Sequence, residues 1–318
     1  MNISVIGCGR WGSFLAWYLN RLGHSVMLYG RKGSGNLAAF REKRTNGLVT
    51  LDSFVRLTDD LEEAVAFAQV LVISIGAQSL RVLMQQLSVL DMNHKPVVLC
   101  MKGIEADTGK RLTEIEEEYL PKSPVAIWVG PGHVQNFTRG IPNCMVIDGK
   151  DETVKQMLVR EFSGELIRFY YGTDLLGNEV GAAAKNVIGI AAGMLDGLDK
   201  TALKGALMSR GTREISRLIR AMGGNELTAY GLSHLGDYEA TVFSEFSHNR
   251  RFGELFVRGE PYGELAEGVA TTTALLRLGE QYGTELPICR AVDSVINSGK
   301  DPNRVLSDLF LRSLKMEF

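Results

Sequence analysis

Residues 3–12 of this chain read ISVIGCGRWG, and this stretch decides the fold. Its first four residues predict a short strand. Gly7, Gly9 and Gly12 follow at once in the spacing GxGxxG, and apolar residues then recur at helical spacing until Gly23. A glycine turn between a strand and a helix lets backbone N–H groups approach a pyrophosphate closely. The stretch therefore predicts a dinucleotide-binding domain, and the alternative is a glycine turn that serves packing alone.

Length and composition restrict the class of protein. A chain of 318 residues is long enough for one large or two ordinary domains, and 45% hydrophobic with 23% charged residues is typical of a soluble globular protein. The net charge of −2 gives no reason to expect a nucleic-acid or anionic-membrane partner. No apolar run is long enough to cross a bilayer, and the first strand leaves no room for a signal peptide. Because the four cysteines are widely spaced, we expect reduced thiols and a cytoplasmic location.

The first part of the chain alternates β-prone runs with helical patterns. This alternation predicts an α/β fold: a Rossmann-type, doubly wound and mostly parallel sheet covered by helices on both faces. After the first strand we expect strands at 25–29, 70–75, 96–100, 125–129, 144–147 and 166–171, and helices at 61–68, 79–87, 110–118 and 152–162. The glycine-rich, charged region 30–55 is predicted to be a mobile connection.

From Asp174 onward the β-prone alternation disappears. Long helical patterns take its place at 178–195, 203–222, 262–282 and 288–298. We therefore expect two domains, a dinucleotide-binding domain over residues 1–173 and an all-α domain over residues 174–318.

The residues after the second predicted strand bear on the choice of cofactor. An acidic residue there would bind the ribose 2′-hydroxyl of NAD, but this chain has Tyr29-Gly30-Arg31-Lys32. Two cations without a carboxylate favour the 2′-phosphate of NADP. NAD stays open, because Arg31 could instead stack on the adenine or lie with Lys32 in a solvated loop.

Lys185 is the strongest candidate for chemistry in the second half. It lies in residues 181–193, GAAAKNVIGIAAG, whose small side chains permit close approach of helices. Desolvation there is expected to lower the pKa of the lysine from about 10.4 toward neutrality. Such a lysine could exchange a proton with a hydroxyl or carbonyl oxygen during hydride transfer. The alternative is a lysine that snorkels at a helix edge.

Further candidates follow strands or sit in polar clusters. Lys102 comes directly after the 96–100 strand, on the ligand side of the predicted sheet, where it could polarise a substrate oxygen. Gly130-Pro131-Gly132 follows the 125–129 strand at the same edge, and Asp237 could orient a catalytic lysine. Hydroxyl, amide and cationic residues near Asp237 suit a phosphate; they are Thr241, Ser247, His248, Asn249 and Arg250. The five histidines lack ligand spacing, so no metal is expected. Each feature could instead be an ordinary surface turn or helix end.

These residues match a known family. The chain resembles the bacterial NAD(P)-dependent glycerol-3-phosphate dehydrogenases over essentially its whole length. The shared motifs are the Gly7–Gly12 turn, Lys102-Gly103, Gly130-Pro131, Gly181 with Lys185-Asn186, Asp196-Gly197-Leu198, Gly236-Asp237, Asn249-Arg250-Arg251-Phe252-Gly253 and Glu267-Gly268. The resemblance implies a Rossmann-type domain, a helical domain and catalysis in the cleft between them. It also implies interconversion of sn-glycerol 3-phosphate and dihydroxyacetone phosphate, which supplies phospholipid synthesis.

The resemblance assigns roles to individual residues. Lys185 falls on the proton acceptor, Lys102 on a lysine that touches both cofactor and substrate, and Asp237 on a substrate-site position. Cofactor contacts fall on Gly7, Gly9, Arg10, Trp11, Gly12, Arg31, Lys102, Val134 and Glu267. Substrate contacts fall on Lys102, Gly130, Gly132, Asn186, Thr241, Ser247, His248 and Asn249. The family is often dimeric, so a homodimer is a possible arrangement.

Two positions depart from the family pattern. His248 stands where the family has an arginine, and Gly132 where it has a hydroxyl residue. Loss of a charged contact would cost roughly 1.5–3 kcal/mol of binding free energy, unless Arg250 turns in to replace it. The altered pocket keeps two alternatives open. One is a dehydrogenase of the same architecture that acts on another small hydroxy compound, and the other is an NADPH-sensing module without turnover.

Overall fold

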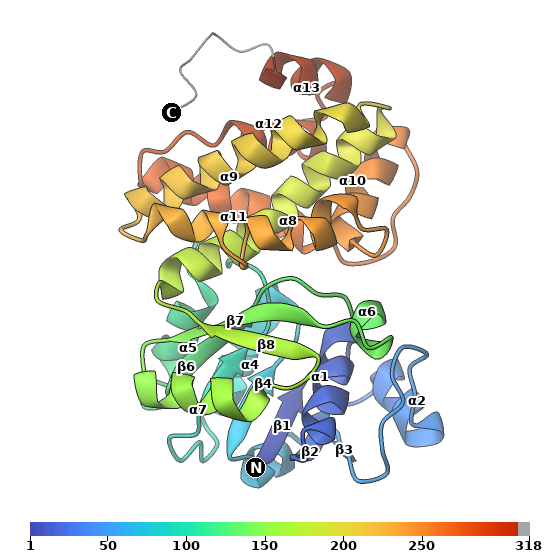
Figure 1. Ribbon diagram of the computed structural model, residues 1–318, viewed down its shortest axis with the longest axis vertical. Helices are drawn as coiled ribbons and strands as arrows, with labels where there is room; N and C mark the ends of the chain where they lie inside the picture. The colour runs from blue at the N-terminus through green and yellow to red at the C-terminus, as the bar shows by residue number, and fades with distance from the viewer. Residues whose placement is uncertain (311–318) are drawn as a thin grey trace. The chain divides into compact units, whose positions relative to one another are not determined.

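The computed structural model describes residues 1–310 and divides the chain into two units. The first unit consists of Met1–Lys102 and Lys110–Glu179, and the second of Gly103–Gly109 and the chain from Val180 onward. The chain passes from the first unit to the second within helix α8 (Leu175–Gly197), a few residues beyond the boundary expected at residue 173. Figure 1 shows the sheet of the first unit and the helices of the second.

An eight-stranded sheet forms the centre of the first unit, in the order β3-β2-β1-β4-β5-β6-β7-β8. The strands are β1 (Asn2–Ile6), β2 (Ser25–Tyr29), β3 (Arg56–Thr58), β4 (Val70–Ile73), β5 (Val97–Leu99), β6 (Val125–Val129), β7 (Asn143–Gly149) and β8 (Ile167–Tyr171). All neighbours are parallel except β6 and β7. The predicted Rossmann-type, mostly parallel sheet is confirmed.

The register brings the carboxyl ends of six strands to one edge of the sheet. Ile6 pairs with both Tyr29 and Ile73, and the alignment continues outward to Thr58 on one side and Leu99 on the other. Leu99 in turn pairs with Ile127 of β6. Ligands of parallel sheets bind at this edge, because the loops that follow the strands converge there.

The helices of the first unit cover the two faces of this sheet (Figure 1). They are α1 (Arg10–Arg21), α2 (Gly35–Lys43), α3 (Leu61–Phe67), α4 (Leu80–Leu87), α5 (Leu112–Tyr119), α6 (Val134–Thr138) and α7 (Glu152–Phe162). Helix α1 buries Phe14 and Tyr18 in an aromatic cluster with Trp128 and Phe137. Each such ring contributes roughly 1.5–3 kcal/mol through burial. This cluster holds the first turn of α1 against the sheet.

The prediction of a mobile connection over residues 30–55 is wrong. Helix α2 forms there because Ser34 caps its first turn by accepting a hydrogen bond from the Leu37 N–H. Leu37 and Phe40, one turn apart, are both buried in the main core. The glycines and charges that suggested a loop lie outside this buried pair. Strand β3 was also missed, since three residues are too few to show alternation.

The second unit is all-helical. Besides α8 it contains α9 (Lys204–Ala221), α10 (His248–Arg258), α11 (Glu267–Gln281), α12 (Pro287–Ile296) and α13 (Pro302–Phe310). Helix α11 begins five residues later than predicted, and α10 and α13 were not predicted. Within residues 1–310, no helix combines the length and the apolar character needed to span a membrane.

Candidate active site

The glycine turn at the end of β1 has a geometry that only glycines allow. Gly7 has a φ of +115°, and its N–H donates to the Tyr29 carbonyl at 2.9 Å. A Cβ at Gly7 would lie 2.1 Å from the Ser74 carbonyl oxygen. A Cβ at Gly12 would lie 1.9 Å from the Gly7 carbonyl oxygen. The turn therefore presses strand, loop and helix together through backbone contacts.

The same turn fits a dinucleotide pyrophosphate. Gly9 is the N-cap of α1, and the first turn of this helix contains no acidic residue. Apart from Gly9, its chain neighbours and the adjoining helix backbone, no heavy atom of residues 1–310 lies within 4 Å of the point where a Gly9 Cβ would stand. Free space in front of a helix N-terminus, with a favourable dipole, is what an anionic pyrophosphate needs. Arg10 begins the helix, and the Trp11 ring packs 5.0 Å from that of Phe14.

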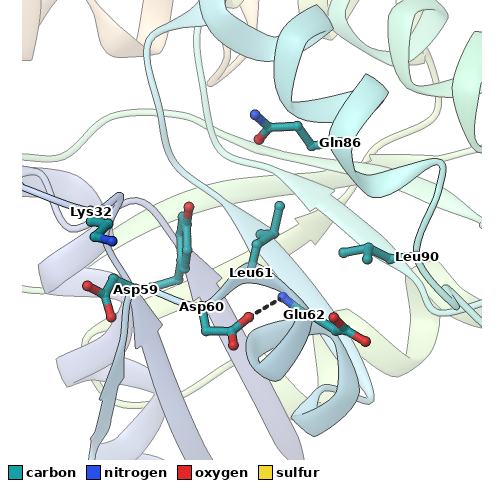
Figure 2. Close-up of a pocket in the computed structure, with 8 residues that line it drawn as sticks. Lys32, Asp59, Asp60, Leu61, Glu62, Gln86 and Leu90 are labelled. Atoms are coloured by element: carbon teal, nitrogen blue, oxygen red, sulfur yellow. Dashed lines mark hydrogen bonds between the residues drawn. The ribbon is translucent and has the colours of Figure 1, made fainter.

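A pocket of about 510 Å³ opens where β2 and β3 end. Figure 2 shows Lys32, Asp59 and Asp60 around it. The segment after β2 carries cations and no carboxylate, as interpreted, but the segment after β3 adds Asp59 and Asp60 to the same pocket. Both are already engaged. Arg41 binds Asp59 at 2.7 Å and lowers the pKa of that carboxyl, while Asp60 caps α3 by accepting the Glu62 N–H at 2.9 Å. Arg31, next to Lys32 in the chain, is exposed.

The loops after β5 and β6 meet at the same edge. Lys102 follows β5, and its Nζ donates to the Gly130 carbonyl at 2.7 Å. A Cβ at Gly132 would lie 2.4 Å from the Phe137 ring. The buried ring thus occupies the place that a side chain at residue 132 would take. Val134, the first residue of α6, is also buried.

The second unit assembles a buried ion pair from three segments, which we call the Lys185 cluster (Lys185, Asp237 and Thr241). Lys185 Nζ lies 3.0 Å from Asp237 Oδ2 and donates to Thr241 Oγ1 at 2.8 Å. Thr241 Oγ1 in turn donates to the Asp237 carbonyl at 2.7 Å. The side chain of Lys185 is 10% exposed and that of Asp237 is fully buried. The desolvated ammonium is therefore charge-balanced and held in one position.

Asparagines connect this cluster to two more helices. Asn249 Nδ2 donates to Asn186 Oδ1 at 3.0 Å, and Asn249 Oδ1 accepts the Gly268 N–H of α11 at 2.9 Å. The close crossing of α8 and α10 depends on Gly193, where a Cβ would lie 1.9 Å from the Arg250 carbonyl oxygen. Glu267, the first residue of α11, precedes Gly268 directly.

The start of α10 carries the expected phosphate residues. Ser247 caps the helix by accepting the Arg250 N–H at 3.3 Å. His248 Nδ1 lies 2.6 Å from the Tyr262 hydroxyl and 3.0 Å from Glu264 Oε2. A carboxylate therefore lies beside the imidazole at the start of α10.

Arg250 does not replace the missing arginine. Its guanidinium donates to Asp196 Oδ2 at 2.8 Å, to Glu254 Oε2 at 3.1 Å and to the Ser244 carbonyl at 3.0 Å. Asp196 also accepts a bond from the buried Lys204 at 2.6 Å. Breaking such a buried pair leaves charges uncompensated, so the guanidinium is fixed where it lies.

Three neighbours of these residues were missed by sequence reasoning. Tyr262 and Glu264 reach His248 from the segment between α10 and α11, and His234 packs near the Lys185 cluster. No local motif marks any of them, since the contacts with His248 and with the Gly181 carbonyl join residues that are 14 to 53 positions apart. Within residues 1–310, no group of acidic, histidine or cysteine side chains could hold a metal ion.

The glycine turn and the Lys185 cluster together indicate a class of enzyme. A glycine turn that fits a pyrophosphate, on a parallel sheet, together with a buried lysine–aspartate pair in a helical unit, is typical of dinucleotide-dependent dehydrogenases. Family models narrow the class further. Residues 2–155 match the N-terminal domain of NAD-dependent glycerol-3-phosphate dehydrogenase, and residues 174–307 match its C-terminal domain.

Relatives agree with these models over the full chain. Glycerol-3-phosphate dehydrogenase [NAD(P)+] of Fusobacterium nucleatum is 35% identical and covers 100% of this chain, with 98% of the relative aligned. The enzyme of the same name from a Bradyrhizobium species is 37% identical over 99% of this chain and 98% of the relative. The chain belongs to the NAD-dependent glycerol-3-phosphate dehydrogenase family, and it is an oxidoreductase that uses NAD or NADP.

A solved structure supports the fold independently. Glycerol-3-phosphate dehydrogenase of Coxiella burnetii superimposes with a TM-score of 0.91 over 98% of both chains, at 24% sequence identity. The backbones of the two proteins therefore have the same fold although only about a quarter of their residues are identical.

Proposed function

We propose that this chain interconverts sn-glycerol 3-phosphate and dihydroxyacetone phosphate, with Lys185 as the acid and base of the reaction. The observation that carries the proposal is the buried contact of 3.0 Å between Lys185 Nζ and Asp237 Oδ2. The relatives named above are called glycerol-3-phosphate dehydrogenases, which supports this choice of substrate.

The residues divide the chemistry among them. When bound, the nicotinamide ring supplies or accepts the hydride at substrate C2. Lys185 gives a proton to the C2 oxygen when the ketone is reduced and takes it back when the alcohol is oxidised. Asp237 and Thr241 hold the ammonium in place, since both contact Nζ. Lys102 is proposed to stabilise negative charge on a substrate oxygen.

The polar residues around α10 form the proposed phosphate pocket. They are Thr241, Ser247, His248 and Asn249, with Asn186, Gly130 and Gly132 as further substrate contacts. His248 carries at most one charge there, and Glu264 lies 3.0 Å from its Nδ1. Because this pair recognises a dianion less well than a guanidinium does, a dehydrogenase of another small hydroxy compound is the second candidate.

The cofactor is proposed to bind across the first unit. The Gly7–Gly12 turn would hold the pyrophosphate, and Arg31 and Lys32 would hold the adenosine ribose and its 2′-phosphate. Arg41 and the α3 backbone already neutralise or occupy the two carboxylates at this end. This arrangement supports a preference for NADP over NAD.

Cellular context completes the proposal. Supply of glycerol 3-phosphate for phospholipid synthesis, a cytoplasmic location and a homodimer are all in keeping with the family. Size-exclusion chromatography with light scattering measures the oligomeric state directly.

One assay tests the proposed reaction. NADPH oxidation is measured with dihydroxyacetone phosphate and with a panel of unphosphorylated ketones and oxoacids that includes dihydroxyacetone. We expect kcat/KM for dihydroxyacetone phosphate to exceed that of every other substrate by about 100-fold or more. A higher value for an unphosphorylated substrate would favour the second candidate. Tight NADPH binding without turnover of any substrate would overturn the enzymatic proposal.

A further inference from the structure

A fully buried histidine ties together the two segments that carry Lys185 and Asp237. His234 Nδ1 lies 2.8 Å from the Gly181 carbonyl oxygen, which can only accept. Nδ1 therefore carries the hydrogen, and Nε2 accepts from the Tyr238 hydroxyl at 2.7 Å. Both side chains have an exposed fraction of 0%. The tautomer of the imidazole is thus set by its two neighbours.

The two hydrogen bonds of His234 involve residues close in the chain to Lys185 and to Asp237. Gly181 lies one helical turn before Lys185 on α8. His234 and Tyr238 flank the single turn Leu235–Asp237, which presents Asp237. One hydrogen bond therefore links the helix of the lysine to the turn of the aspartate.

Gly181 permits this link to be short. A Cβ at Gly181 would lie 3.0 Å from the His234 Cβ, closer than nearly all real contacts of this kind. A larger residue would push the turn, and with it Asp237, away from α8. The glycine at the start of the small-residue stretch thus serves the approach of His234.

The histidine contributes geometry and no charge. Burial lowers the pKa of His234 to about 4, against the opposing effects of the Gly181 and Gly211 backbone and the Asp237 carboxylate. The Lys185 ammonium acts in the same direction as burial. Burial also raises the pKa of Tyr238, so its hydroxyl remains a donor. At neutral pH the pair adds no second cation beside Lys185.

We propose that His234, held by Tyr238, is a positioning residue that sets the distance between Lys185 Nζ and Asp237 Oδ2. The inference rests on the proposed function of Lys185, and it adds a second tie to the one through Thr241. Displacement of a reacting group by about 1 Å can cost about 10²-fold in rate. His234 touches neither substrate nor cofactor in this scheme and acts only through the ion pair.

Two near-isosteric substitutions separate this role from simple packing. In His234→Asn the amide nitrogen takes the place of Nδ1 and keeps the bond to the Gly181 carbonyl. In His234→Gln the amide lies nearer the place of Nε2, so the bond to Gly181 is lost. We expect His234→Gln to lower kcat about 10- to 100-fold, with KM for NADPH within about two-fold of the native value. His234→Asn should restore kcat to within about three-fold.

Two further variants are needed: Tyr238→Phe as a second test and His24→Asn as a control. Tyr238→Phe removes one oxygen without changing shape, and should lower kcat about three- to ten-fold even if a His234 variant folds poorly. His24→Asn breaks a histidine–carbonyl contact of 2.9 Å to Glu161 in the first unit. This control should lower the unfolding temperature and leave kcat unchanged.

The outcomes distinguish the inference from the function on which it rests. If both His234 variants lose kcat equally, or if His234→Gln and Tyr238→Phe keep native kcat, His234 is not a positioning residue. A Lys185→Ala protein assayed in parallel tests the proposed function itself. Native kcat in Lys185→Ala would refute that function, whereas its loss together with native kcat in His234→Gln would refute only the present inference.

Discussion

The glycine turn of the first unit and the Lys185 cluster of the second are built in opposite ways. In the turn, backbone atoms make the site: a Cβ at Gly12 would overlap the Gly7 carbonyl, and the space before Gly9 is open. In the cluster, side chains make the site: Lys185, Asp237 and Thr241 come from three segments that span 56 residues. One site is a local motif, and the other exists only after folding.

This difference means that binding and chemistry can be damaged separately. A change in the glycine turn should lower the affinity for the cofactor and leave the contacts of Lys185 intact. A change in the cluster should slow the reaction and leave the cofactor bound. Each of the following predictions tests this separation, from the largest expected effect to the smallest.

Lys185→Ala should have the largest effect. Loss of the proposed acid and base is expected to lower kcat by about 10²–10⁴-fold, with the Kd for NADPH unchanged. Steady-state kinetics and fluorescence titration measure the two quantities. Lys155→Met is the matched control, because Lys155 is also a buried, ion-paired lysine but belongs to the first unit. A similar fall of kcat in the control would show that loss of any buried lysine suffices.

Gly9→Ala should affect binding alone. Since no heavy atom of the described chain beyond the adjoining backbone lies near the new Cβ, the protein should fold normally. The methyl group would instead meet the pyrophosphate, and we expect the Kd for NADPH to rise about 10- to 100-fold. Gly35→Ala introduces a methyl group at another open helix start and should leave the Kd unchanged. A native Kd in Gly9→Ala would place the cofactor elsewhere.

His248→Arg should improve the substrate pocket. A guanidinium at this position supplies a permanent charge for the phosphate, so KM for dihydroxyacetone phosphate should fall by about ten-fold or more. kcat and the KM for NADPH should stay within about two-fold. His94→Arg on the first unit serves as the control for added charge. If KM rises instead, the new arginine pairs with Glu264 rather than with substrate.

The smallest expected effect concerns the stability of the protein and the buried carboxyl group of Glu116, which differs from Asp237 in its surroundings. Both carboxyl groups are fully buried, but neither oxygen of Glu116 has a hydrogen-bond partner in the described chain. Burial raises its pKa to about 8, so the folded state binds more protons than the unfolded state between pH 4.5 and about 8. Stability from this group is therefore present at low pH and lost as pH rises through that range.

The substitution Glu116→Met should remove the loss of stability that accompanies the rise in pH. We expect a free energy of unfolding close to native at pH 5 and higher than native by about 1–3 kcal/mol at pH 8. Urea unfolding at the two pH values measures the difference. Glu118→Gln, which changes a partly exposed carboxyl paired with Arg81, should show no comparable gain at pH 8. Equal stability of the native protein and Glu116→Met at both pH values would contradict the prediction.

Much of the fold could be predicted because its signals are local. The strands at 25–29 and 125–129 and the helix at 152–162 have the predicted bounds. Helix α2 was missed because its two core residues, Leu37 and Phe40, are surrounded by glycines and charges. Helix α10 was missed because its polar first turn, which begins at His248, was interpreted as part of a phosphate-binding cluster.

The site could be predicted only in part. Sequence reasoning and the family resemblance named Lys185, Lys102 and Asp237, and the structure places two of these within 3.0 Å of each other. The contacts of His234, the Glu264 carboxylate beside His248 and the fixed position of Arg250 all depend on pairs distant in sequence. No sequence pattern predicts such pairs, because the residues come together only when the chain folds.

Parallel measurement of NADPH affinity and kcat in Gly9→Ala and Lys185→Ala tests the central separation most directly. We expect the first variant to lose affinity and, at saturating NADPH, to keep kcat within about three-fold. The second should keep affinity and lose kcat by at least about 100-fold. If Lys185→Ala retains kcat, or if both variants lose affinity and kcat together, the account of two separately built sites is wrong.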